Sequence, residues 1–227
     1  MNRLTSILTG LAGSIFLLSS PGLAAKDVSP FELYGDRISF TVLRNGKDVG
    51  THDVKFKQTG KNLVVTSRFD LKIRALAINF YKYNYTSIGK WRNGKMVQLN
   101  TDVFENGEKT RVQARAKGNG LAVVAPTGPL KIKGSLYPTT HWNPNIVKSS
   151  RVFNTITGQA NKVRIKSAGK ENVPTERGSR PATRYVYSGD LQTEAWYDGK
   201  GRWVKLRFKA DDGSTIEFVC KRCLGKS

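Results

Sequence analysis

Histidine and cysteine are scarce in this sequence of 227 residues, which has two of each. The cysteine pair does not suit a c-type haem, because Leu224 stands where that motif needs a histidine. His52 and His141 lie far from the cysteines and show no zinc-finger spacing. The sequence also lacks a GxSxG nucleophile elbow and a glycine-rich phosphate loop. We therefore expect no catalytic residue, no metal and no cofactor.

Long apolar runs are missing outside the first 24 residues, which have the three-part layout of a signal peptide. Arg3 supplies the positive charge, residues 8–18 are apolar, and Gly22 and Ala24 suit cleavage after Ala24. The apolar stretch is shorter than the ~20 residues that span a bilayer. We expect an exported, periplasmic mature chain, residues 25–227, with no transmembrane span.

Both cysteines lie in FVCKRC, close to the end of the sequence. An oxidising compartment favours a disulfide between Cys220 and Cys223. Residues i and i+3 of an extended strand lie about 10 Å apart, beyond the bridging limit of about 7 Å, so the chain must turn at Lys221-Arg222. Redox or metal handling by the pair is the alternative, although the pair follows a strand rather than opening a helix.

Acidic residues are few: 17 Asp and Glu stand against 38 Lys and Arg, giving a formal charge of +21. Such a charge often indicates nucleic-acid binding, but an exported protein rarely meets nucleic acid. The expected partner is an anionic envelope component (lipid, lipopolysaccharide or glycan) or an acidic protein. The alternative is a soluble protein with an alkaline isoelectric point and no such partner.

Sustained helical periodicity is also absent, and apolar residues instead alternate with polar ones, most clearly in residues 62–74. Hairpin turns are indicated by six Asn-Gly or Asp-Gly pairs, which begin at Asn45, Asn93, Asn106, Asn119, Asp198 and Asp212. We predict an all-β fold, a long antiparallel meander that curls into an open barrel or half-shell.

Two intervals interrupt this meander within a single domain. Four prolines break residues 125–154, which we interpret as an irregular plug. Asn143-Pro144 suits a helix N-cap and first helical position, which predicts a short helix near 143–150. Residues 170–181 are polar and contain two prolines, and we interpret them as an exposed loop.

Lysine and arginine alternate with apolar residues on four of the predicted strands. The candidates for an anionic-surface site on the wet face of the sheet are Arg68, Lys72, Arg74, Arg111, Arg115, Arg164, Lys166, Lys205 and Arg207. The alternative is that these cations only keep strands soluble and deter edge pairing.

Small apolar residues in 109–117 would leave room inside a curled sheet unless bulky side chains fill it. Aromatic residues could form either a filled core or the wall of a ligand cavity. The candidate ligand-binding residues are Tyr81, Tyr83 and Tyr85, the carboxylate Glu194 beside Trp196, and His141 with Trp142 at the mouth. His52 is interpreted as an inward-facing structural residue.

The stretches ISFTVLRNGKDVGTHDVKF and YSGDLQTEAWYDGKGRWVKLRFKADDGSTIEF, with THWN between them, resemble a proteobacterial domain-of-unknown-function family of exported all-β proteins. The resemblance implies a curved antiparallel β shell, distantly similar to periplasmic lipoprotein carriers, and it carries no catalytic residue.

Our first hypothesis is therefore a periplasmic, non-enzymatic binding protein for an amphipathic or lipid-like envelope molecule. An interaction module that docks an acidic protein or glycan on the cationic face is the alternative. An envelope hydrolase using His141 is the second alternative, with Ser149 or Ser150 and Asp190 or Glu194 as its partners.

Overall fold

The computed structural model describes residues 28–75 and 78–225, and the side chains of residues 74–80 lie outside this description. The predicted signal peptide, residues 1–24, and the side chain of Arg74 are therefore outside the described part. No helix among the described residues is long and apolar enough to span a membrane.

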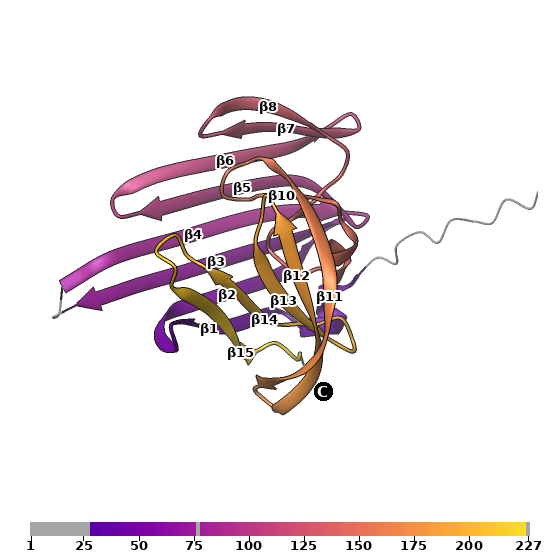
Figure 1. Ribbon diagram of the computed structural model, residues 1–227. Helices are drawn as coiled ribbons and strands as arrows, with labels where there is room; N and C mark the ends of the chain where they lie inside the picture. Colours follow the sequence, from indigo (N-terminus) through magenta and orange to yellow (C-terminus); the bar gives the residue numbers. More distant parts are fainter. Residues whose placement is uncertain (1–27, 76–77, 226–227) are drawn as a thin grey trace, which may run out of the picture.

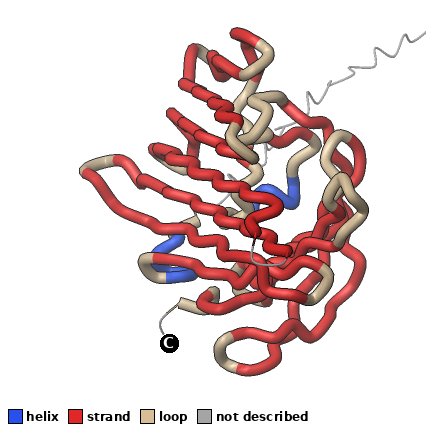
Figure 2. Tube along the Cα trace, turned by 90° about the vertical axis from the view of Figure 1, so that its left-hand side faces the viewer, coloured by secondary structure: helices blue, strands red, loops and turns tan. Residues whose placement is uncertain are grey.

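Fifteen strands form one sheet, which stays open over the described residues (Figures 1 and 2). The strands are β1 (Arg37–Arg44), β2 (Lys47–Thr59), β3 (Asn62–Ala75), β4 (Ile78–Arg92), β5 (Lys95–Glu105), β6 (Glu108–Lys117), β7 (Gly120–Ala125), β8 (Gly128–Lys133), β9 (Tyr137–Pro138), β10 (Arg151–Phe153), β11 (Ala160–Thr175), β12 (Gly178–Gly189), β13 (Thr193–Asp198), β14 (Trp203–Lys209) and β15 (Thr215–Arg222). The predicted all-β, largely antiparallel meander is confirmed.

The sheet has two arms that meet where β1 pairs with β15. The first arm runs from β1 outward to β8, and the second runs from β15 back to β9. Figure 1 shows the first arm as a stack of long twisted strands and β11 as an arc on the other side. The inner faces of both arms carry the apolar residues of the alternating strands, so the core lies between them.

Three of the predicted hairpin turns have the geometry that Asn-Gly favours. Asn45, Asn93 and Asn106 have φ between 47° and 49°, and each is followed by a glycine that also has positive φ. Two consecutive residues of positive φ form a type I′ turn, whose twist matches that of the flanking strands. Between β6 and β7 the two loop residues are instead Gly118-Asn119, one position before the predicted pair. The two Asp-Gly turns lie in longer loops.

The interval 170–181 is not the predicted loop but a hairpin formed by β11 and β12. Pro174 and Pro181 are tolerated because each has only one neighbouring strand. The β10–β11 ladder ends at Lys162, and the β12–β13 ladder begins at Ala182. A proline without an amide hydrogen costs no sheet hydrogen bond on an unpaired edge.

The predicted plug, residues 125–154, is partly regular. Its first part belongs to the β7–β8 hairpin, and its later part contains β9, β10 and the 3₁₀ helix η1 (Pro144–Lys148). Asn143 caps η1 as predicted, because its side-chain oxygen accepts a hydrogen bond from the Asn145 backbone N–H at 3.0 Å.

A short helix that the sequence analysis did not predict, α1 (Pro30–Tyr34), precedes β1. The Tyr34 side chain is fully buried. Its hydroxyl donates to the Trp142 carbonyl at 2.8 Å and accepts from the Trp203 N–H at 2.9 Å. Tyr34 therefore connects α1, the plug and the second arm.

Cys220 and Cys223 form a disulfide with a Cα–Cα distance of 5.8 Å. Cys220 lies opposite Phe40 and Arg222 lies opposite Ser39, so Lys221 is an extra residue in β15. This bulge shortens the span between the two cysteines while the strand continues, where we had predicted that the strand would turn away.

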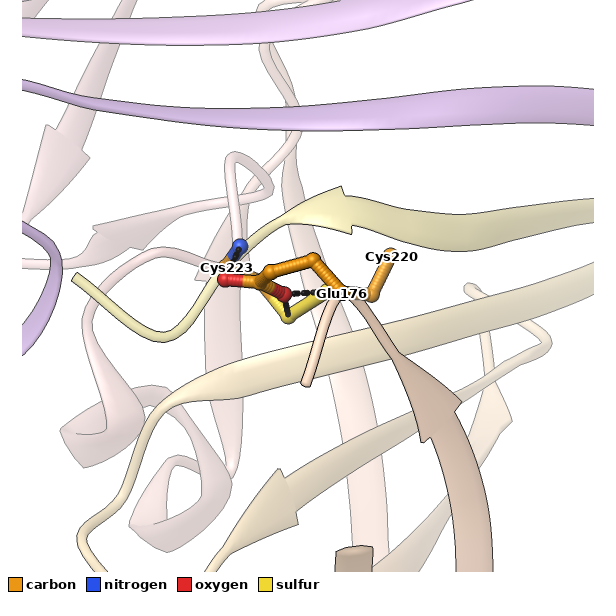
Figure 3. A group of neighbouring side chains, drawn as sticks. All are labelled: Glu176, Cys220 and Cys223. Carbon is orange, nitrogen blue, oxygen red and sulfur yellow. Dashed lines mark hydrogen bonds between the residues drawn. A yellow bond between two sulfur atoms is a disulfide. The ribbon is translucent and has the colours of Figure 1, made fainter. Parts of the chain in front are cut away.

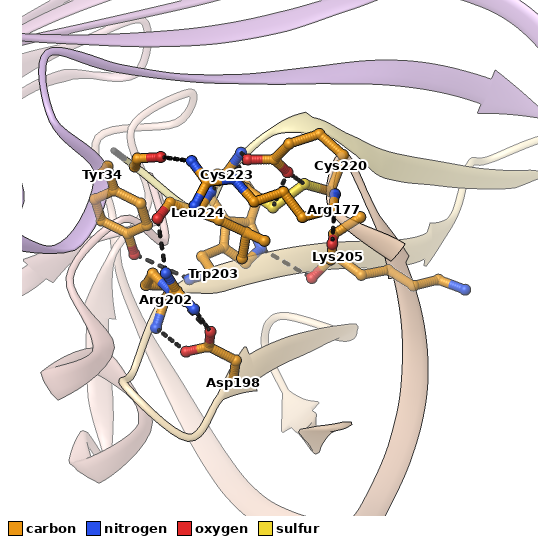
Figure 4. Close-up of a disulfide and its surroundings, with 12 residues drawn as sticks. Tyr34, Arg177, Asp198, Arg202, Trp203, Lys205, Cys220, Cys223 and Leu224 are labelled. Carbon is orange, nitrogen blue, oxygen red and sulfur yellow. Dashed lines mark hydrogen bonds and ion pairs between the residues drawn. A yellow bond between two sulfur atoms is a disulfide. The ribbon is translucent and has the colours of Figure 1, made fainter. Parts of the chain in front are cut away.

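The carboxylate of Glu176, at the tip of the β11–β12 hairpin, lies against the disulfide (Figure 3). It accepts hydrogen bonds from the backbone N–H groups of Cys223, at 3.1 Å, and Leu224, at 2.9 Å. Figure 4 shows a second contact with the same segment, in which Arg202 donates to the Leu224 carbonyl and pairs with Asp198. The disulfide and its neighbours thus join the end of β15 to the β11–β12 hairpin and to the loop between β13 and β14.

Candidate functional site

The two arms enclose a cavity of about 680 Å³, a volume in the range of small-molecule sites. Apolar side chains form most of its wall. From the first arm come Phe69, Leu71 and Ile73 of β3, and from the second come Leu206 and Phe208 of β14 and Ile216 and Phe218 of β15. Side chains of alternate residues on a strand point to the same face, so each strand adds several groups to one wall.

The mouth of the cavity is marked by its exposed and charged lining residues. Arg44 and Asp212 form an ion pair with 2.5 Å between nitrogen and oxygen, and Glu105 accepts a hydrogen bond from the Tyr81 hydroxyl at 2.6 Å. The Ser214 hydroxyl and backbone N–H, together with Arg44, lower the pKa of Asp212 below its usual range. Exposed Lys209, Asp211, Gln192 and Ile156 complete this end.

The inner end is marked by buried lining residues. His52 of β2 and His141 of the plug are each 6% exposed, and Trp203 of β14 is 1% exposed. Burial lowers the pKa of His52 to about 3. It lowers the pKa of His141 to about 3 as well, and repulsion from His52 adds to that effect. Both imidazoles are therefore neutral at pH 7.

The ladder of Tyr81, Tyr83 and Tyr85 lines this cavity. Tyr81 lies at the mouth, Tyr83 packs on Phe69 with ring centroids 5.5 Å apart, and Tyr85 is buried. The Tyr85 and Thr155 hydroxyls are 2.8 Å apart, which connects the ladder to the plug. Burial raises the pKa of all three phenols, so they remain protonated at neutral pH.

Three other candidates, Trp142, Glu194 and Trp196, are not among the residues that line this cavity, and His141 lies at its buried inner end rather than at the predicted mouth. Trp142 is buried behind the inner end, where it packs on Phe56 and Trp91. Glu194 and Trp196 project from the opposite face of β13, because Ala195 between them pairs with the inward-facing Leu206.

On that opposite face Trp196 is fully buried beneath charged side chains. Lys205 and Arg207 lie over its ring at 5.1 and 5.3 Å from the centroid. Glu194 pairs with Arg207 at 2.5 Å and with Arg184 at 3.4 Å, and the hydrogen bond that Arg207 donates to Glu194 raises the pKa of Arg207. The register explains this position: Trp196 pairs with Lys205 of β14, and residues paired across two strands share a face of the sheet.

The predicted cationic surface is consequently divided. Lys205 is half-buried and pairs with Glu217 at 3.0 Å, so Lys205 and Arg207 belong to an ion-pair network rather than to a free surface. Arg164 and Lys166 are exposed on β11 in the second arm. Arg68, Lys72, Arg111 and Arg115 are exposed on the first arm.

The outer face of the first arm carries more positively charged residues than the predicted surface candidates. The register of β2 to β8 places further exposed lysines on the face that holds Arg68, namely Lys55, Lys57, Lys82, Lys90, Lys109, Lys131 and Lys133. We call this surface the basic face. It also displays Ile88, Phe104 and Val124, which are 36–55% exposed.

The two carboxylates that the hydrolase hypothesis pairs with His141 have other partners. The Asp190 carboxylate accepts a hydrogen bond from the Lys162 backbone N–H at 2.8 Å, and Glu194 lies on the outer face of the second arm. His141 Nδ1 has no hydrogen-bond partner among the described residues, so no carboxylate orients the ring through that nitrogen.

Sequence reasoning missed the wall from the second arm and the ion pair at the mouth. The alternation in residues 204–209 did set Leu206 and Phe208 opposite the cations, but only the sheet order shows that they face β3 across a space. Arg44 and Asp212 looked like ordinary turn residues.

Comparison with known proteins supports the fold. A search among curated proteins found no match. The crystal structure of a beta-barrel-like protein of domain of unknown function DUF1849 from Brucella abortus is similar, with a TM-score of 0.61 and 11% sequence identity. The similarity covers 84% of this chain and 97% of that chain, and at this identity it bears on the fold alone.

The predicted resemblance to a domain-of-unknown-function family of all-β proteins is confirmed. That the family is proteobacterial and exported stays a prediction. Residues 40–221 match the family described as "Domain of unknown function (DUF6134)", and this match extends from β1 to β15. The chain therefore belongs to the DUF6134 family.

Proposed function

We propose that this protein is a non-enzymatic binding protein for an amphipathic or lipid-like molecule, which occupies the cavity between the two arms. The observation that carries the proposal is the cavity of about 680 Å³ with an apolar wall and a charged mouth. The apolar part of a ligand in such a space would bury its own surface and that of the wall. Burial of apolar surface contributes about 25 cal/mol of favourable free energy per Å².

The charged mouth supports an amphipathic ligand rather than a wholly apolar one. Arg44 and Lys209 contribute positive charge there, and Glu105, Asp211 and Asp212 contribute negative charge. A polar headgroup at this position would keep its hydration and contact groups of both signs. The resemblance to periplasmic lipoprotein carriers that we infer from the sequence points the same way.

We also propose that the protein acts in the periplasm and that the basic face holds it near anionic envelope components. Support comes from the predicted signal peptide and from exposed apolar groups, Ile88, Phe104 and Val124, set among cations. Each cation near an anionic membrane contributes about 1 kcal/mol. Docking of an acidic protein or glycan on the same face is the second candidate, and the exposed apolar side chains favour a membrane surface over it.

Native mass spectrometry of the protein purified from the periplasm of its own source tests the cavity proposal. We expect a copurified small amphipathic molecule that is released on denaturation. Ile73→Trp, which enlarges a partly exposed wall residue near the mouth, should reduce its occupancy at least about 10-fold by obstructing the space.

Ile88→Trp is the matched control, because Ile88 lies on the outer face of β4 and is 43% exposed. This variant should retain the bound molecule at the wild-type level. A clean unliganded mass for the wild-type protein, or equal occupancy in Ile73→Trp and wild type, would contradict the proposal.

A further inference from the structure

Two imidazoles at the inner end of the cavity have no hydrogen-bond partner for three of their nitrogens. These are Nδ1 and Nε2 of His52 and Nδ1 of His141, among the residues that the structure describes. Both side chains line the cavity although they are more than nine-tenths buried. Buried polar groups in folded proteins nearly always have a partner, so these nitrogens indicate one that comes from the cavity.

The surroundings of His52 offer no alternative partner. Its ring packs among Phe40, Phe69, Phe218 and Trp203, with ring centroids 4.9–6.2 Å away. The one polar group in this set, the Trp203 indole N–H, already donates to the Lys205 carbonyl at 2.9 Å. His52 is also one of the residues that line the cavity.

His141 is held at this place by an uncommon turn. Its φ is 57°, and the Trp142 N–H donates to the Thr140 carbonyl at 2.8 Å, which makes His141 the centre of a γ-turn with positive φ. The Tyr197 hydroxyl fixes the turn by donating to the His141 carbonyl at 2.8 Å. Such strained backbone persists where the surroundings enforce it, and it is concentrated at functional sites.

The two imidazoles both pack against the same aromatic ring, that of Trp203. The His52 and His141 centroids are each 5.6 Å from the ring centroid of Trp203. Both imidazoles are neutral at pH 7, so each has one donor and one acceptor nitrogen. The charged residues of the cavity wall all lie toward the mouth, where they are exposed or half-buried.

A carboxylate or phosphate at the inner end would therefore lose its hydration without gaining a cation, which disfavours it. The end of a plain acyl chain would leave the nitrogens unpartnered. An uncharged hydroxyl or carbonyl group can accept from a neutral imidazole, and a hydroxyl can also donate to one.

We propose that His52 and His141 form a polar subsite that binds an uncharged hydroxyl or carbonyl oxygen at the inward end of the cavity ligand. This inference rests on the proposed function, and it narrows the ligand to molecules with an apolar body and a neutral oxygen at the buried end.

Pyrene and 1-hydroxypyrene test the subsite, because they differ by one hydroxyl and both report binding by fluorescence. We expect the protein to bind 1-hydroxypyrene about 10-fold more tightly than pyrene at pH 7, the effect of one well-formed hydrogen bond. 1-Pyrenebutyrate, which is anionic, should gain no such advantage at the inner end.

The variant His52→Phe keeps an aromatic ring but removes two nitrogens, and it should reduce the preference for 1-hydroxypyrene to about 2-fold or less. Phe69→Leu is the matched control, because Phe69 lines the same cavity and contacts His52 without polar atoms. It should weaken both probes in parallel and leave their ratio unchanged.

A measurement without substitutions covers the case in which His52→Phe does not fold. The chain has only two histidines, so long-range ¹H–¹⁵N spectra contain only their two imidazole spin systems. Addition of 1-hydroxypyrene should shift the imidazole nitrogen signals, and pyrene should leave them near their starting values.

The outcomes separate the two proposals. Equal affinity for pyrene and 1-hydroxypyrene, or a preference that survives in His52→Phe, would overturn the subsite and leave the cavity as a binding site. If neither pyrene nor 1-hydroxypyrene binds the folded, ligand-stripped protein, and its native mass is clean, both proposals are contradicted.

Discussion

The Tyr34 hydroxyl donates a hydrogen bond to the main-chain carbonyl of Trp142, 108 residues further along the chain. The same oxygen accepts from the Trp203 N–H, so one phenol satisfies two buried backbone groups from different parts of the fold. Burial raises the pKa of Tyr34, which keeps the hydroxyl protonated and able to donate.

Tyr34→Phe should lower the free energy of unfolding by about 2–4 kcal/mol, because a buried carbonyl and a buried N–H both lose their partner. Chemical denaturation of the variant and the wild type measures the difference. Tyr81→Phe is the control at the exposed mouth and should change stability by less than about 0.5 kcal/mol. A Tyr34→Phe protein as stable as the wild type would show that water replaces the hydroxyl.

The buried histidines predict a loss of stability in mild acid. The folded-state pKa of each is lowered to about 3, against the ordinary value of 6.5. Between these values the unfolded chain binds about two more protons than the folded chain, so stability falls as pH falls. Near pH 5.5 the slope should be about 2.5 kcal/mol per pH unit.

Denaturation curves between pH 7 and about pH 5 measure this slope, in a range where most carboxylates do not yet titrate. His52→Phe removes one of the two groups and should halve it. A flat profile in the wild type would mean that the imidazoles are solvated or paired in solution.

The disulfide should contribute modestly to stability. It closes a loop of only a few residues, for which the chain-entropy estimate is about 2 kcal/mol. The double variant Cys220→Ser and Cys223→Ser should lose about that amount in a denaturation experiment. Reductant should destabilise the wild type equally and leave the double variant unchanged. A loss above about 5 kcal/mol would indicate that the disulfide organises the contacts of Glu176 and Arg202 as well.

The basic face should bind anionic vesicles in a salt-dependent manner. Replacing Arg68, Lys72 and Arg115 by glutamine should weaken sedimentation with phosphatidylglycerol vesicles roughly 100-fold, at about 1 kcal/mol for each cation. The matched control replaces Arg164 and Lys166 on β11, outside that face, and should have a much smaller effect. Binding that does not weaken with added salt, or that is equal on phosphatidylcholine, would exclude this role.

Period-two alternation and Asn-Gly turns were enough to predict the all-β meander, because strand faces and type I′ turns are set by neighbouring residues. The hairpin at 170–181 was missed since its prolines are acceptable only at unpaired edges, and edges are defined by the order of strands. The candidate site was also only partly predictable, because its two walls are brought together by the order of the strands. The Tyr81, Tyr83 and Tyr85 ladder was visible as an alternating set, but its opposite wall comes from β14 and β15.

The prediction that Trp196 lines the cavity was wrong for a different reason. A tryptophan between alternating residues is most simply assigned to the interior, yet here cationic side chains bury it on the other face. Nothing in the local sequence distinguishes these two ways of covering an indole. His52 was correctly placed inward, but its lack of a partner depends on neighbours from β1, β3, β14 and β15.

The pairing of β1 with β15 has a consequence for how the chain folds. Over the described residues, all other neighbouring strands in the sheet are also consecutive along the chain. Apart from the parallel β9–β10 pair, each arm can therefore assemble hairpin by hairpin, with small entropic costs of loop closure. The two arms become one sheet only when the residues around Phe40 and Cys220 come together, and the cavity exists from that moment. Folding speed should thus depend on this one long-range encounter, while the ability to hold a ligand arises last.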